Sequence, residues 1–126
     1  MNTFQSIYKE GEWQTPLPKK SDAALVFAFG DRHAMATSHM LSQLKSSFPE
    51  AEIVGCSTSG EIQGSEIHDE SIALTAVHFK KSHVVAKSDN ISNYADSSSL
   101  GAALVNQLDR KGLRYVFVVS DGQLIN

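Results

Sequence analysis

The sequence predicts an α/β domain in which helices pack against a mixed β-sheet. Two runs rich in apolar residues, 24–29 and 114–119, are typical of strands that are covered on both faces. Apolar stripes at helical spacing follow the first run and precede the last one. With 126 residues, the chain forms one domain at most. We expect the element order β-α-β-β-β-α-β.

The first strand, 24–29, ends in Gly30 and Asp31, and the Asp31 carboxylate is a suitable cap for a following helix. Pro49 ends that helix, since proline interrupts the helical hydrogen-bond ladder. One apolar stripe of the helix is expected to face the sheet. It consists of Thr37, Leu41, Leu44 and Phe48, with Met40 beside them.

The middle of the chain is expected to supply three strands. A short strand at 52–55 leads into a run of small polar residues, and residues 63–70 have the polar composition of a loop. Residues 71–79 form a longer strand, in which Ile72, Leu74, Ala76 and His78 share one face. Lys80 and Lys81 then turn the chain into a strand at 82–87, which completes a β-hairpin.

Both ends of the chain carry further expectations. Residues 1–22 show little periodicity and are interpreted as an N-terminal arm or entry loop ahead of the domain at 23–126. A second helix begins at Asp96 or the serines after it and ends at Gly112; its stripe is Leu100, Ala103, Leu104 and Leu108. The last strand, 114–119, lies so near the end that we expect the chain to continue into a further module.

Composition excludes several classes of function. Eleven Lys and Arg against fourteen Asp and Glu give a net charge of −3, whereas nucleic-acid-binding domains normally carry a basic excess. The apolar runs are too short to span a bilayer, and the N-terminus lacks the apolar segment of a secretory signal. A single cysteine fits a reducing compartment. We therefore expect a cytoplasmic protein with no membrane span and no nucleic-acid partner.

The candidate site lies where three expected strands end. The first strand is followed by Gly30, the second by Gly55, and the last by Ser120. If these strands are parallel, their loops meet at one edge of the sheet, where open α/β sheets bind ligands. Glycines there let the backbone approach a ligand, and hydroxyls donate and accept hydrogen bonds. The competing interpretation is a turn whose serines and threonines only cap backbone groups. The candidate ligand-binding residues are Gly55, Cys56, Ser57, Thr58, Ser59, Gly60, Glu61, Asp121 and Gly122.

The stretch from Glu52 to Ile62, EIVGCSTSGEI, resembles the signature of the N-terminal module of the FIST domain family. The resemblance covers roughly residues 23–126, and it implies an intracellular sensory domain of a bacterial signalling system. Such domains regulate partners such as histidine kinases, cyclic-di-GMP enzymes or chemoreceptors, and are thought to bind small ligands such as amino acids. Some members of the family are haem proteins that sense nitric oxide. The usual chain continues into a C-terminal module, which this sequence does not contain.

These patterns leave three functions open. The first is a non-catalytic sensor, in which Glu61 or Asp121 binds a ligand ammonium. The second is a non-covalent haem sensor, for which His78 is the candidate axial ligand because it lies between apolar neighbours. The third is a hydrolase or transferase that uses Cys56 with His33 and Asp121. Cys56 also fits a buried apolar residue or a ligand-contacting thiol. The histidines and the cysteine form no zinc pattern.

Overall fold

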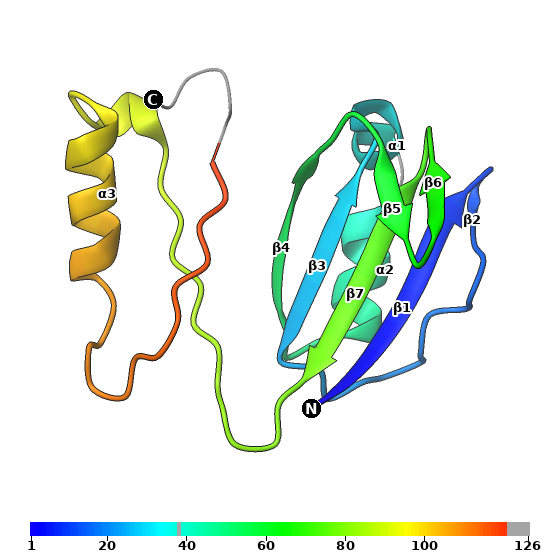
Figure 1. Cartoon of the computed structure of the whole chain (residues 1–126), viewed down its shortest axis with the longest axis horizontal. Helices are drawn as coiled ribbons and strands as arrows, with labels where there is room; N and C mark the ends of the chain where they lie inside the picture. Colours follow the sequence, from blue (N-terminus) through cyan, green and yellow to red (C-terminus); the bar gives the residue numbers. More distant parts are fainter. Residues whose placement is uncertain (38, 121–126) are drawn as a thin grey trace. The chain divides into compact units, whose positions relative to one another are not determined.

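The computed structural model describes residues 1–37 and 39–120, and it divides into two compact units at residue 85 (Figure 1). The first unit, residues 1–84, is a five-stranded mixed sheet with helices and a separate two-stranded hairpin. This arrangement confirms the predicted α/β class. The sheet strands, in spatial order, are β2 (Glu12–Trp13), β1 (Asn2–Lys9), β7 (Ile72–His78), β3 (Leu25–Gly30) and β4 (Glu52–Ser57).

The centre of the sheet combines parallel and antiparallel pairing. β3 and β4 are parallel, in a register that runs from Leu25 opposite Glu52 to Gly30 opposite Ser57. β7 pairs antiparallel with β3 on its other side, and β1 pairs antiparallel with β7. β3 and β7 therefore each have a strand on both sides. The prediction of burial on both faces for 24–29 holds on one face only, because Val26 and Ala28 are buried whereas Leu25, Phe27 and Phe29 are half-buried.

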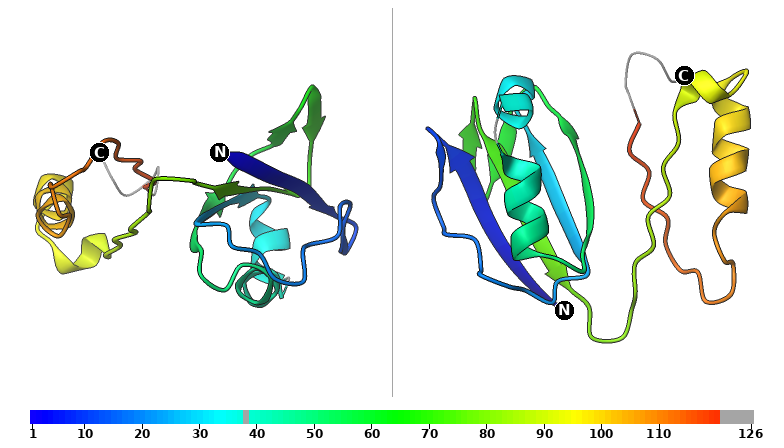
Figure 2. Two further views of the ribbon diagram at one scale, coloured as in Figure 1. Left: turned by 90° about the horizontal axis from the view of Figure 1, so that it is seen from below. Right: turned by 180° about the vertical axis from the view of Figure 1, so that it is seen from behind.

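The hydrophobic core lies between the sheet and the helices α1 (Arg32–Thr37) and α2 (Met40–Ser47), which cover one face (Figure 2). Alternate residues of β3, Val26 and Ala28, point into this core, as do alternate residues of β7. The helical side supplies Leu44 and Phe48, both almost completely buried. Burying side chains of this size contributes about 2–3 kcal/mol each. The predicted inward face of 71–79 is thereby confirmed for Ile72, Leu74 and Ala76, and His78 is half-buried.

The single helix predicted after Asp31 is two helices in the structure. Asp31 caps the first as expected, because its carboxylate accepts a hydrogen bond from the Ala34 amide at 2.8 Å. The second helix begins at Met40, and its buried residues are Met40, Leu44 and Ser47. Leu41, which the predicted stripe included, is 51% exposed. The stripe was wrong at Leu41 because the buried side of α2 is centred on Met40, Leu44 and Ser47.

The expectation of an N-terminal arm or entry loop at 1–22 was wrong for the residues that form β1 and β2. β1 occupies the edge of β7 along its full length, from Asn2 opposite His78 to Tyr8 opposite Ile72. The strand buries Ser6 and Ile7, and β2 follows it after a tight turn. The apolar alternation of a strand is weak in this segment. β1 is instead stabilised by its pairing with β7, which is distant in the sequence.

β1 also explains why the predicted hairpin of 71–79 with 82–87 was wrong. That hairpin needs a free edge on β7, and β1 and β3 occupy both edges. Residues 82–87 accordingly contain no strand. The other local hairpin of the unit was missed: residues 63–70, predicted as a loop, contribute to β5 (Glu61–Gln63) and β6 (Glu66–His68), which pair antiparallel. Short polar strands of this kind carry little apolar alternation.

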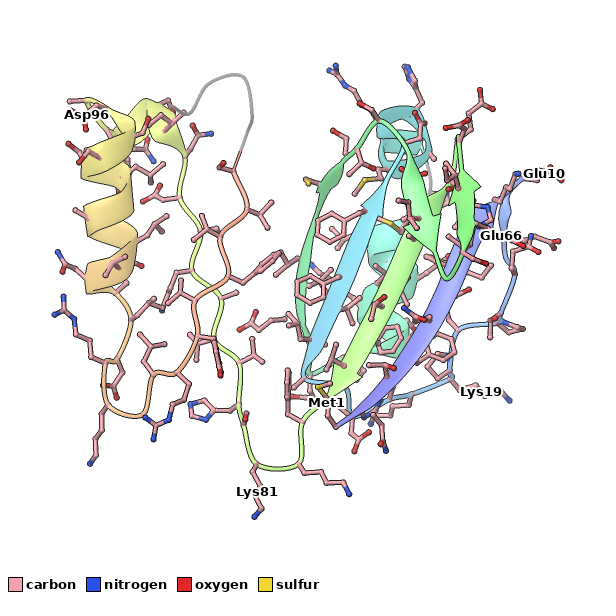
Figure 3. All side chains as sticks on the ribbon, viewed as in Figure 1. Met1, Glu10, Lys19, Glu66, Lys81 and Asp96 are labelled. Atoms are coloured by element: carbon pink, nitrogen blue, oxygen red, sulfur yellow. The ribbon has the colours of Figure 1, made fainter. Side chains whose placement is uncertain are left out.

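The second unit contains the 3₁₀ turn η1 (Ile91–Asn93) and the helix α3 (Ser97–Asn106). Asp96, labelled in Figure 3, caps α3 as predicted, accepting from the Ser99 amide at 2.7 Å. This hydrogen bond lowers the pKa of the Asp96 carboxyl, so its stabilising effect is present above the ordinary pKa of 3.8 and lost as pH falls through the lowered one. Leu100 is buried, whereas Ala103, Leu104 and Leu108 are half-buried.

Two further expectations for this unit were wrong. α3 ends at Asn106 rather than at Gly112, and the cap residue Gln107 donates to the carbonyls of Leu104 and Val105. Residues 114–119 form no strand, and Tyr115 is 94% exposed. An apolar run becomes a strand only when a neighbouring strand accepts and donates hydrogen bonds to its backbone.

Among the residues that the structure describes, no helix is long and apolar enough to cross a membrane.

Gly55 provides a test of this packing. A Cβ built on Gly55 would overlap the backbone carbonyl of Ala28 on β3, whereas one built on Gly101 of α3 meets no atom. We expect Gly55→Ala to lower the free energy of unfolding by about 1–3 kcal/mol, because backbone must shift to admit the methyl group. Gly101→Ala is the matched control, and it should be neutral or stabilise the helix by up to about 1 kcal/mol. Urea unfolding measures both; equal effects would contradict the close approach of β3 and β4.

Candidate functional site

Two of the three strand ends that were expected to converge, those of β3 and β4, meet in the structure, whereas residues 114–119 form no strand. The start of β7 joins them. The Thr58 amide, just after β4, donates to the Gly30 carbonyl at 2.9 Å. The Asp31 amide donates to the carbonyl of Ser71, just before β7, at 2.8 Å. Gly30 has no room for a side chain, because a Cβ there would overlap the backbone of Ser71 and Ile72. The Gly30–Asp31 backbone therefore joins three strand ends in one junction.

This junction holds a buried carboxylate. Glu61, the first residue of β5, is 4% exposed. Its Oε1 accepts a hydrogen bond from the Thr58 hydroxyl at 2.6 Å, and its Oε2 accepts one from the Ser71 hydroxyl at 2.7 Å. Ser71 is itself fully buried. The two hydroxyls come from opposite sides of the junction, so Glu61 ties the loop after β4 to the start of β7. We call Thr58, Glu61 and Ser71 the carboxylate clasp.

The clasp leaves the charge of Glu61 without a cationic side chain. Within residues 1–37 and 39–120, no lysine, arginine or histidine forms an ion pair with this carboxylate. His68 is its register partner in the β5–β6 hairpin, but the His68 Nε2 lies 3.7 Å from Glu66 Oε2 instead. A carboxylate has about four lone-pair positions, and two hydroxyls use only half of them. Buried charges are normally paired, so the arrangement suits an added cation such as an ammonium group.

The remaining predicted residues of the loop have different surroundings. Gly55 is required by the close approach of β3 and β4, so its role is structural. Ser57 and Ser59 are exposed. Gly60 has a φ of +156°, a backbone conformation that other residues rarely adopt, and only Asp69 Oδ1 lies near its open side, at 3.6 Å from a built Cβ. Asp121 and Gly122 lie outside the described residues.

Cys56 is half-buried on β4, in register with Phe29 of β3. In the part of the chain that the structure describes, no imidazole or carboxylate hydrogen-bonds its thiol, and no group of three metal-ligating side chains is present. His33 lies in α1 with its side chain exposed. No hydrogen bond among the described residues therefore joins the thiol to a base, and a cysteine nucleophile requires a base within reach.

His78, the candidate haem ligand, lies at the opposite end of the sheet from the clasp. Its Nδ1 is 2.9 Å from Asp22 Oδ1, and its side chain is 29% exposed. The hollow beside it has a volume of about 460 Å³, and its lining is mostly polar: Asn2, Thr3, Asp22, His78, Phe79 and Lys80. A haem macrocycle needs a larger apolar pocket around its axial ligand. These residues do not fit a haem.

Sequence reasoning found Thr58 and Glu61 but missed Ser71. Ser71 is separated from Glu61 by ten positions and by the whole β5–β6 hairpin. The only local signal is a small polar residue at the start of an apolar strand, a pattern that also describes many ordinary strand ends. The contact of Ser71 with Glu61 depends on the pairing of β7 with β3, which the local sequence does not indicate.

Comparison with known proteins identifies the family. The family model described as the FIST N domain matches residues 24–126. No curated protein and no solved structure matches the chain.

The clasp predicts a large stability effect at Ser71. Replacing Ser71 with alanine removes a buried donor and leaves Glu61 Oε2 without its hydroxyl, which costs about 1–3 kcal/mol. Ser57→Ala is the matched control because that hydroxyl is exposed, and its effect should stay within about 0.5 kcal/mol. Urea unfolding at neutral pH measures both variants. Similar stabilities for the two would show that the clasp contributes nothing.

Proposed function

Because this chain belongs to the FIST N domain family, a family of sensory domains in signalling proteins, we propose that it binds a small amine-bearing ligand at the carboxyl ends of β3 and β4. The ligand class is an amino acid or a similar molecule that carries an ammonium and a carboxylate. One observation carries the proposal: Glu61 is buried, is held by two neutral hydroxyls, and has no cationic side chain paired with it among the described residues.

The two ends of such a ligand need different partners. Glu61 would accept hydrogen bonds from the ammonium through its unused lone pairs, and charge-assisted bonds of this kind are the stronger ones. The hydroxyls of Ser57 and Ser59 are exposed beside it and would bind the ligand carboxylate. Thr58 does not serve there, because its hydroxyl donates to Glu61 and its amide donates to Gly30. Gly60 adds no side chain next to Glu61 in the chain.

Ligand binding at Glu61 also provides a route to a signal. Glu61 begins β5, and its side chain connects that hairpin to Thr58 and Ser71. An ammonium that enters the clasp would compete with one of these hydroxyls and so shift the β5–β6 hairpin. A ligand regulates a partner only through different affinities for two states. The partner would be a cytoplasmic signalling protein such as a histidine kinase, a cyclic-di-GMP enzyme or a chemoreceptor, and no chemistry at the loop is required.

Calorimetry on the full chain tests this function. The titrants are the common amino acids, each beside the carboxylic acid that lacks its amino group. At least one amino acid should bind, and its deaminated analogue should not. Glu61→Gln keeps the shape of the side chain but removes its charge, and loss of one buried charged partner costs about 2–5 kcal/mol. Affinity should therefore fall roughly thirty-fold or more.

Glu66→Gln is the matched control, because Glu66 is exposed on the same hairpin (Figure 3) and its removal should leave affinity unchanged. Equal binding of the deaminated analogues, or full affinity in Glu61→Gln, would contradict the role of the buried carboxylate. Circular dichroism of each variant confirms that any loss of binding does not come from unfolding.

A further inference from the structure

A second cluster of reactive side chains lies at the far end of the same sheet. Ser21 and Asp22 precede β3, and His78 ends β7. The antiparallel register places Leu25 opposite Val77, so these two ends are adjacent. The clasp lies at the other end of β3, where Gly30 is opposite Ile72. The cluster is therefore separate from the proposed ligand site.

Asp22, His78 and Ser21 form a chain of polar contacts from the carboxylate through the imidazole to the hydroxyl. His78 Nδ1 lies 2.9 Å from Asp22 Oδ1, so the imidazole proton is on Nδ1 and the carboxylate accepts it. In the neutral imidazole His78 Nε2 keeps its lone pair, and this nitrogen lies 3.5 Å from Ser21 Oγ. The Ala23 amide donates to the same Oγ at 3.2 Å. Since that amide occupies an acceptor position of the hydroxyl, the Ser21 proton is free to point toward Nε2.

This is the polarity that activates a serine nucleophile. A carboxylate orients the imidazole, the imidazole accepts the hydroxyl proton, and the oxygen becomes able to attack a carbonyl. The distance of 3.5 Å is long for a hydrogen bond, and catalytic hydrogen bonds are commonly long before a substrate is bound. Identification rests on geometry and roles, because such a triad occurs on unrelated folds and in different sequence orders.

A hollow of about 460 Å³ adjoins the imidazole, and it is lined by Asn2, Thr3, Asp22, His78, Phe79 and Lys80. Ser21 does not line it, but it precedes Asp22 in the chain and lies 3.5 Å from His78 Nε2. This volume is in the range that accommodates small molecules. Phe79 supplies an apolar surface for an acyl chain. Lys80 adds a positive charge and Asn2 a polar side chain to the same lining. A lining of this composition is compatible with a small carboxylic ester.

We propose that Ser21, His78 and Asp22 form a nucleophilic site that hydrolyses small carboxylic esters. Ser21 Oγ forms a bond to the carbonyl carbon while His78 Nε2 takes the hydroxyl proton. The bond between that carbon and the alcohol oxygen then breaks, and the alcohol leaves with the proton from Nε2. Water attacks the resulting acyl-serine and gives one proton to Nε2. The acid is released when the Ser21–acyl bond breaks, and Oγ recovers its proton from the imidazole.

Two measurements on the full chain test the proposal: hydrolysis of p-nitrophenyl acetate, and labelling by a fluorophosphonate probe mapped by mass spectrometry. We expect one adduct, on Ser21, with no labelling in Ser21→Ala. His78→Gln should slow both reactions by about a hundred-fold, the contribution typical of a general base. Ser82→Ala and His83→Gln are the matched controls, because they change exposed residues of the same types nearby and should leave both rates unchanged.

Asp22 is a positioning residue, and its carboxylate is 96% exposed, so water screens its effect on the imidazole. Asp22→Asn should slow labelling by less than His78→Gln does, and Asp22→Glu should restore part of the rate. An adduct on another residue, unchanged rates in Ser21→Ala, or labelling of the folded chain no faster than that of the urea-unfolded chain would overturn the proposal. Amino-acid binding at Glu61 should be unaffected by Ser21→Ala, which keeps this test independent of the sensory function.

Discussion

The backbone of Gly30 and Asp31 is the junction on which the candidate site depends. Its carbonyl fixes Thr58 at the end of β4, and its amide fixes Ser71 at the start of β7. Only a glycine permits this approach, since any side chain at Gly30 would overlap the backbone of the neighbouring strand. Once Thr58 and Ser71 are fixed on either side, their hydroxyls converge on Glu61. The burial of the Glu61 carboxylate is thus a consequence of how β3 and β4 end and β7 begins beside one another.

The clasp explains how a charged side chain is kept in a buried position without a cation from the described chain. Two hydroxyl donors offset part of the cost of removing a carboxylate from water, and the remainder is left for another group to supply. A site of this kind is stable enough to exist without a ligand and still gains from binding one. This combination suits a sensory domain, because the same contacts that hold the hairpin in place would also respond to the proposed ligand.

The sheet brings different chemistry to its two ends. At the carboxyl end of β3, hydroxyls surround a buried acid, which is an arrangement for binding. At the amino end, the Asp22 carboxylate lies 2.9 Å from His78 Nδ1, and the Ser21 hydroxyl lies 3.5 Å from His78 Nε2, which is the arrangement on which the proposed nucleophilic site rests. The antiparallel pairing of β7 with β3 creates both, because β7 begins beside Gly30 and ends beside the segment that enters β3.

Local patterns determined the α/β class, the strands β3, β4 and β7, the caps at Asp31 and Asp96, and the family motif around Glu61, because each depends on neighbours within a few positions. The tertiary structure decided which strands pair. It placed β1 on the edge of β7 and so left no room for the expected hairpin, and residues 114–119 form no strand. The tertiary structure also brings Ser71 to Glu61 and Ser21 to His78. Backbone pairing and side-chain contacts between distant residues depend on which edges are already occupied, and no local periodicity records that competition.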